Sequence, residues 1–153
     1  IHNLMTSNNM IESYSIFKKY PSTLNININK TKFLAKVNKN GINFFLGSNG
    51  KLIKSTIKNE KIPFLFGDYN FNDFMILKNI IDASNLKFDE IKNLYFFPSG
   101  RWDVEIHSGV LIRLPKNKLK KYFDLSLMML NDQRFKGTKL IDARQVDQVI
   151  IDG

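Results

Sequence analysis

The chain contains no cysteine among its 153 residues. This absence excludes disulfide bonds, thiolate metal sites and a cysteine nucleophile, and it is compatible with both the cytoplasm and the periplasm. The only histidines are His2 and His107, and neither has a second ligand at the spacing of a zinc site. No apolar run approaches the roughly 20 residues that a helix needs to cross a bilayer.

Motifs for nucleotide binding and hydrolysis are also missing. The segment Gly47-Ser48-Asn49-Gly50-Lys51 resembles a phosphate loop, but its glycines are too close together and Leu52 follows the lysine. A hairpin turn is therefore expected at this position. No serine stands in the Gly-x-Ser-x-Gly arrangement of a nucleophile elbow.

Two pairs of acidic residues are the best candidates for acid–base chemistry. Asp89 and Glu90 lie in a segment with the composition of a solvated loop. Asp103 and Glu105 alternate with apolar residues, which predicts that they line the polar face of a half-buried strand. Nothing else in the chain supplies an activated site, so we expect a non-enzymatic protein with no cofactor and no metal.

Trp102 is the single tryptophan, and it alternates with Val104 and Ile106. This spacing favours a core position for the indole, because residues two apart on a strand share a face. A role as a recognition anchor is the alternative, since tryptophan is enriched at the centres of protein interfaces.

The chain carries 23 basic and 14 acidic residues, which gives a net charge of +9. One interpretation is an electrostatic footprint for nucleic acid or another anionic surface. The other is compositional, because lysine, asparagine and isoleucine have AT-rich codons and all three are frequent here. The basic residues are spread along the sequence, and the densest cluster, Lys116 to Lys121, lies on a predicted helix with an apolar face. Composition is therefore favoured, and a basic nucleic-acid-binding domain is the alternative function.

The first 29 residues have the pattern of a small α/β unit. Ile1, Leu4 and Met5 have helical spacing, and strands are predicted at residues 11–19 and 24–29. Leucine and isoleucine alternate with asparagine in the second strand, which indicates a strand with one buried face.

The remaining sequence predicts a curved antiparallel β-sheet with two helices, so the expected fold class is α+β, preceded by a partial α/β unit. A meander with two Asn-Gly turns is expected first. A Pro- and Gly-bounded apolar loop follows at residues 62–67. The expected elements are strands at 33–38, 42–46, 52–57, 94–97, 139–142 and 145–151, a hairpin at 101–114, and helices at 71–83, capped by Asn70 or Asn72, and 117–131.

Motifs at four places in the chain carry a resemblance to a known family. One runs from Lys19 to Ile28, contains Tyr20-Pro21-Ser22-Thr23-Leu24 and is followed by Phe33-Leu34-Ala35. The others are the apolar loop at residues 62–67, the Gly100-Arg101-Trp102 start of the hairpin and the Asp142-Ala143-Arg144 close. Together they resemble the FtsQ family of bacterial cell-division proteins. The resemblance implies that residues 1–29 are the C-terminal part of a POTRA domain and that residues 30–153 are the FtsQ-type β domain.

The resemblance also implies a function. FtsQ-like proteins are non-enzymatic scaffolds of the divisome at the septum, held in the inner membrane by one upstream anchor, with this region in the periplasm. Their β domain binds the FtsB–FtsL pair, and strand addition to the terminal edge is the expected mechanism. The residues implied are Arg144, Gln145, Val146, Asp147, Gln148, Val149, Ile150 and Ile151.

Overall fold

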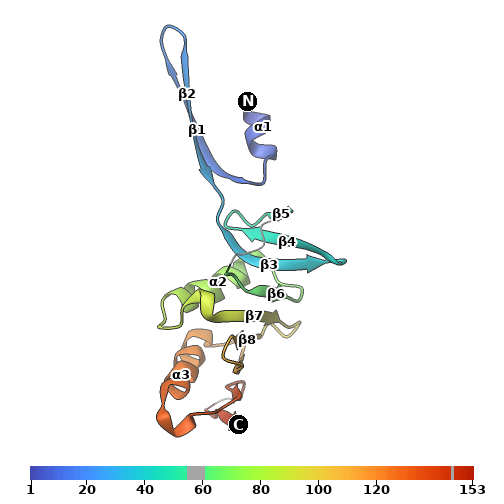
Figure 1. The fold of residues 1–153 in the computed structure, drawn as a ribbon, viewed down its shortest axis with the longest axis vertical. Coiled ribbons are helices and arrows are strands. Elements are labelled where there is room, and N and C mark those ends of the chain that lie inside the picture. Colours follow the sequence, from blue (N-terminus) through green and yellow to red (C-terminus); the bar gives the residue numbers. More distant parts are fainter. Residues whose placement is uncertain (55–60, 146) are drawn as a thin grey trace. The chain divides into compact units, whose positions relative to one another are not determined.

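The computed structural model describes residues 1–54, 61–145 and 147–153 (Figure 1). The chain divides into two compact units, Ile1–Asn59 and Glu60–Gly153. The expected boundary at residues 29/30 lies within the first unit, just before the last residue of its second strand.

The first unit begins with α1 (His2–Ser7), β1 (Ile11–Lys19) and β2 (Thr23–Lys30), as the sequence predicts. β1 and β2 form a two-stranded antiparallel sheet. The expected buried face of β2 is wrong, because every residue of this strand is exposed. The physical reason is that the hairpin is a single thin layer, and both α1 and the turn residues Ser48 and Asn49 contact β1 and not β2.

The meander follows as β3 (Phe33–Lys39), β4 (Ile42–Gly47) and β5 (Leu52–Lys54). Its strands are antiparallel, and the N–H of Gly47 donates to the carbonyl of Lys51 at 2.9 Å. The glycine-rich segment is therefore the hairpin turn that the sequence predicts. Residues 55–57 of the expected third strand lie outside the described residues.

The second unit contains both longer helices. In chain order its elements are β6 (Phe64–Phe66), α2 (Phe71–Asp82), β7 (Ile91–Phe96), β8 (Trp102–Ile106), β9 (Leu111–Leu114), α3 (Leu119–Asn131), β10 (Leu140–Asp142) and β11 (Ile150–Asp152). Its strands lie in the order β11-β10-β9-β8-β7-β6. The pairs β9–β10 and β6–β7 are parallel and the others antiparallel. The expected α+β class with a curved, mostly antiparallel sheet is confirmed.

One element of this unit differs from its prediction. Residues 64–66, expected as part of a loop, form β6 because Leu65 is buried beside Leu94 of β7. Gly67 ends the strand with a φ of +102°. A Cβ at this position would lie 2.0 Å from the carbonyl oxygen of Phe96, so only glycine fits without movement of the backbone.

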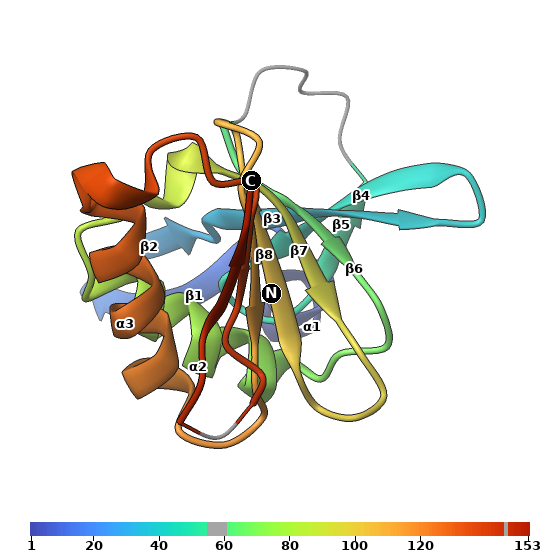
Figure 2. The ribbon, with the colours of Figure 1, turned by 90° about the horizontal axis from the view of Figure 1, so that it is seen from below.

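Helices α2 and α3 lie on the same side of this sheet (Figure 2). The alternating side chains of β8 divide between the two faces, and Trp102, Val104 and Ile106 are buried, which confirms the expected core position of the indole. The two helices contribute apolar side chains to the same core, and these are Phe74, Leu77, Ile81, Tyr122, Phe123 and Leu127. The opposite face of the sheet is therefore the one that carries the polar residues of β8.

Candidate docking interface

β11 is the terminal strand at one edge of the sheet in the second unit. It pairs with β10 on one side, and no described strand lies on its other side. An edge strand of this kind presents unpaired N–H and C=O groups, which are the groups that an added strand would use.

Two backbone hydrogen bonds show which residues of β10 point their N–H and C=O groups toward β9 and which point them toward β11. The N–H of Leu111 donates to the carbonyl of Lys139, and the N–H of Ala143 donates to the carbonyl of Arg113, both at 2.9 Å. The N–H and C=O groups of successive strand residues point to alternate sides of the strand. The odd-numbered residues of β10 therefore face β9, and the even-numbered residues face β11.

This alternation identifies the free backbone group of β11. Leu140 and Asp142 face β11, and their register partners there are Asp152 and Ile150. Ile151 lies between these two partners, so its N–H and C=O point away from β10 toward the open edge. Ile151 is thus the residue of β11 that would pair with an added strand.

β11 is shorter than the expected strand at 145–151. Arg144 turns back to bind the Asp142 carboxylate, and its Nε donates to Oδ1 at 2.7 Å. Asp147 has a φ of +60°, and its N–H donates to the hydroxyl of Tyr122 at 3.2 Å. These contacts make a turn, so the strand prediction is wrong for residues 145 and 147–149, while Val146 lies outside the described residues.

The expected partner-binding residues therefore fall into two groups. Ile150 and Ile151 lie in β11, and Ile150 is 48% exposed. The residues before them form the turn: Gln145, Asp147 and Gln148 are exposed, and Arg144 and Val149 are half-buried. The backbone edge and the turn are adjacent parts of one surface, but only the edge has strand geometry.

A row of alternating charges crosses the face of the sheet that the helices leave uncovered. We call it the charged ladder, and its members are Arg101, Asp103, Arg113, Asp142 and Arg144. The guanidinium-to-carboxylate distances are 3.8 Å for Arg101–Asp103, 3.7 Å for Arg113–Asp103 and 3.8 Å for Arg113–Asp142. Strand register creates the row, because Arg113 is the direct neighbour of Asp103 on β8 and of Asp142 on β10.

The two aspartates of the ladder differ in their environment. Asp103 is 5% exposed, and its Oδ1 has no hydrogen-bond partner among the described residues. Burial raises the pKa of Asp103, while Arg101 and Arg113 oppose the rise. Asp142 accepts hydrogen bonds from Arg144, and these lower the pKa of Asp142. Sequence reasoning missed the part played by Arg113, although its alternation with Ile112 and Leu114 places it on this face.

An aromatic hollow adjoins the charged ladder. Tyr95 is the register neighbour of Asp103, its hydroxyl donates to Glu105 at 2.9 Å, and Phe66 stacks on its ring with centroids 5.1 Å apart. Hydrogen bonding by Asn93 is the main cause of a lowered pKa of Glu105, and burial is the main cause of a raised pKa of Tyr95. The hollow measures about 370 Å³ and is lined by Tyr95, Phe97, Asp103, Glu105, Gly109 and Leu111.

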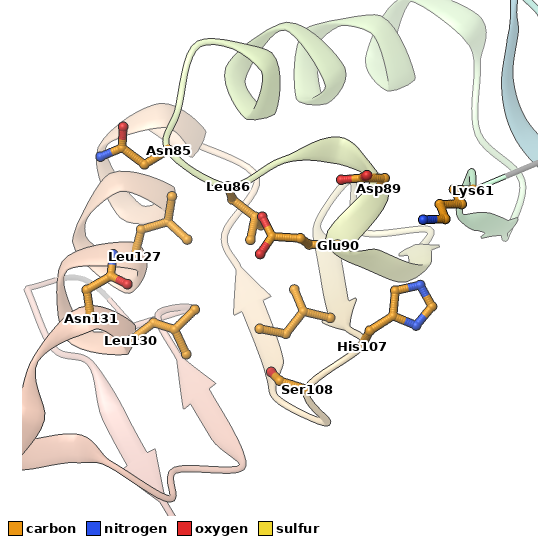
Figure 3. A pocket seen from close by; sticks show the side chains of 11 residues that line it. Lys61, Asn85, Leu86, Asp89, Glu90, His107, Ser108, Leu127, Leu130 and Asn131 are labelled. Carbon is orange, nitrogen blue, oxygen red and sulfur yellow. The ribbon is translucent and has the colours of Figure 1, made fainter.

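A larger cavity of about 700 Å³ lies between α3, the segment after α2 and the β8–β9 turn (Figure 3). It contains Asp89 and Glu90, the first carboxylate pair singled out from the sequence. One oxygen of Glu90 accepts the N–H of Lys87 at 2.7 Å, which is a capping contact. His107 lies at the exposed end of the hairpin, as predicted. Apolar and polar side chains line the cavity together, and neither carboxylate contacts a nucleophile in the described part of the chain.

The described residues hold no group of three or more histidine, aspartate or glutamate side chains placed to bind a metal ion. No helix among them is both long enough and apolar enough to cross a membrane. The open edge of β11, with Asp142 of the charged ladder on the neighbouring strand β10, is the candidate interface. No protein-family model matches the chain, and no curated protein sequence matches it.

Proposed function

We propose that this protein is a non-enzymatic docking module of the bacterial divisome, of the FtsQ kind. It binds an FtsB–FtsL pair by accepting a strand on β11 and acts in the periplasm at the division septum, held by an upstream inner-membrane anchor. The observation that carries this proposal is the open edge at Ile151, because strand addition needs a free backbone N–H and C=O at an accessible edge.

The charged ladder also supports the proposal that the partner docks at this edge. Asp142 of the ladder lies on β10 opposite Ile150 of β11. A strand added beyond β11 would therefore lie two strands away from Asp142. The ladder holds three guanidinium groups and two carboxylates, which leaves one positive charge in excess. An acidic side chain next to the added strand would therefore be attracted to this face, and such complementarity favours one orientation of the partner.

The decisive experiment compares two substitutions at one residue. Ile151→Pro removes the outward N–H, and proline is tolerated at a strand edge. Ile151→Ala is the control, because it removes most of the isoleucine side chain, as the proline substitution does, but keeps the N–H. We expect the proline variant to bind the periplasmic part of an FtsB–FtsL pair at least about tenfold more weakly than the alanine variant, because one main-chain bond and its neighbours are lost.

Both variants must first be shown to be folded, by thermal unfolding followed with circular dichroism. Equal affinities for the folded proline and alanine variants would contradict strand addition. Arg144→Glu would be a less direct test of the same surface, because Arg144 already binds Asp142 within the chain.

A further inference from the structure

The net charge of the protein is concentrated in its first unit. Residues 1–59 contain nine lysines, no arginine and one acidic residue, Glu12, which gives a net charge of +8. Residues 60–153 contain 14 basic and 13 acidic residues, a net charge of +1. The lysines are spread along the chain, but all acidic residues except Glu12 follow residue 59, so a strongly basic unit precedes a nearly neutral one in the sequence.

The same unit contains the β1–β2 hairpin (Figure 1), and one face of this hairpin exposes aliphatic side chains. The strand register places Ile16 opposite Ile26 and Lys18 opposite Leu24, so the aliphatic side chains share one face. Ile16, Leu24, Ile26 and Ile28 are 37% to 46% exposed. An isolated two-stranded hairpin is only marginally stable in water, and an exposed apolar face of this kind normally contacts another surface.

Aromatic and basic side chains occur close to the turn of the hairpin, on both of its faces. The register places Lys18 on the aliphatic face and Phe17 and Lys19 on the opposite face. Tyr20 is 90% exposed and Phe17 is 57% exposed, and Lys18 and Lys19 stand between them in the sequence. Tyrosine prefers the boundary between lipid and water, and lysine can bury its alkyl stem while its ammonium group remains among polar headgroups. The hairpin turn thus combines the side chains typical of a membrane-interface anchor.

We propose that the first unit binds the surface of an anionic lipid bilayer through the β1–β2 hairpin. Its aliphatic face enters the boundary between headgroups and acyl chains, and the surrounding lysines contact the anionic headgroups. Charge complementarity selects this occupant, because buried apolar area and cationic charge together drive interfacial binding. This inference goes beyond the proposed docking function and does not depend on it.

A nucleic acid would use the same positive charge but a different set of side chains. Non-specific binding of single strands uses several aromatic platforms along a basic groove, often with arginine. The first unit has no arginine, and the exposed apolar face of its hairpin is aliphatic over most of its length. Aliphatic side chains gain stability in the acyl region of a bilayer and not against bases, so the lipid surface is the better match.

The test is co-sedimentation of the full chain with vesicles, either of phosphatidylcholine alone or with about 30% phosphatidylglycerol. We expect the bound fraction to be at least about fivefold higher on the anionic vesicles at near-physiological salt, and to fall as salt is raised. Lys18→Glu/Lys19→Glu should reduce binding about fivefold or more, because two attractive charges become repulsive. Ile26→Ser should reduce it by removing inserted apolar area.

Matched variants in the second unit serve as controls. Lys136→Glu/Lys139→Glu changes the total charge by the same amount, and Ile76→Ser alters an isoleucine that is 54% exposed on α2. Both controls should bind anionic vesicles as the unmodified protein does. Equal loss in the controls, or equal binding to neutral and anionic vesicles, would overturn the proposal.

Two further measurements test the alternative binding partners of the hairpin face, which are nucleic acid and a second copy of the chain. Tighter binding to a mixed-sequence single-stranded oligonucleotide than to the anionic vesicles, at the same salt, would replace the lipid surface with nucleic acid. Self-association in analytical ultracentrifugation that Ile26→Ser abolishes, without vesicle binding by the unmodified protein, would assign the face to a second copy and overturn the proposal.

Discussion

At the scale of single residues, two aspartates on one sheet face show how partners decide the cost of a buried charge. Asp142 accepts hydrogen bonds from Arg144, whereas the guanidinium groups near Asp103 stay 3.7 to 3.8 Å away from its carboxylate. A buried charge with ion-pair neighbours but no hydrogen bond contributes little net stability, because the desolvation of the group is not fully offset.

Asp142→Asn tests the favourable case. The pKa of Asp142 is lowered on folding, so its carboxylate stabilises the native state above the unfolded pKa of 3.8 and stops doing so as pH falls through the folded value. We expect the variant to lose about 2 kcal/mol at neutral pH, the value typical of a charged hydrogen bond. The loss should shrink as pH falls through the lowered pKa of the folded state and vanish below it, where the carboxyl is protonated in both states. Urea unfolding at neutral pH and at a series of acidic pH values measures this.

Asp103→Asn is the matched comparison on the same face. Burial raises the pKa of Asp103, so the neutral form is favoured in the native state and stability falls as pH rises through the raised pKa. The substitution should therefore cost less at neutral pH than Asp142→Asn does. An equal or greater loss would show that Arg101 and Arg113 compensate the buried charge fully.

Trp102 is a structural residue by its position. It is 2% exposed, and its ring centroid lies 4.7 Å from that of Phe96. Trp102→Ala should reduce the free energy of unfolding by about 3–5 kcal/mol, as for other truncations of large aromatic side chains in cores. Chemical denaturation measures the loss, and partner affinity under conditions where the variant is folded should be unchanged. Wild-type stability combined with lost partner binding would assign Trp102 to recognition.

At the scale of elements, the start of α2 offers a matched pair of asparagines. The Oδ1 of Asn70 accepts the N–H of Asp73 at 2.8 Å, so Asn70 is the N-cap, while Asn72 is exposed within the first turn. Asn70→Ala should lower stability by about 1 kcal/mol, because a helix donor loses its partner. Asn72→Ala should cost less than half as much, since alanine is the better helix former there. Thermal unfolding of the two variants distinguishes the positions, and equal losses would contradict the assignment of the cap.

Most elements of this fold could be predicted because their patterns are local. The apolar stripe of α2, the alternation in β8 and the Asn-Gly turn after β3 all depend on residues close together in the sequence. β6 could not be predicted in this way, because three residues become a strand only through pairing with β7. The exposed face of β2 was also missed, since alternation indicates a face but not what covers it.

The candidate site was predictable only in part for the same reason. The terminal position of Ile150 and Ile151 suggested an edge, and the sheet order places them there. The start of β11 was mispredicted because the turn depends on Tyr122, which lies far away in the sequence. The charged ladder was not predictable, because it requires the parallel register that brings Arg113 beside Asp142.

At the scale of the whole molecule, charge and strand edge lie in different units. The net charge of +8 belongs to residues 1–59, and the open edge of β11 belongs to the second unit. The total composition does not reveal this division of charge. The division depends on the boundary at residues 59/60 and on the uneven placement of the acidic residues along the sequence. The two proposed interactions therefore use separate side chains and separate physical forces.

This separation predicts that the two interactions can be removed one at a time. Lys18→Glu/Lys19→Glu should weaken binding to anionic vesicles and leave the affinity for an FtsB–FtsL pair within about twofold, because main-chain pairing at Ile151 does not involve those charges. Ile151→Pro should have the opposite pair of effects, because it changes neither the charge nor the apolar face of the hairpin. Measuring both affinities for both variants completes the comparison. If either variant weakened both interactions while remaining folded, the two surfaces would be coupled, and the assignment of one interaction to each unit would be wrong.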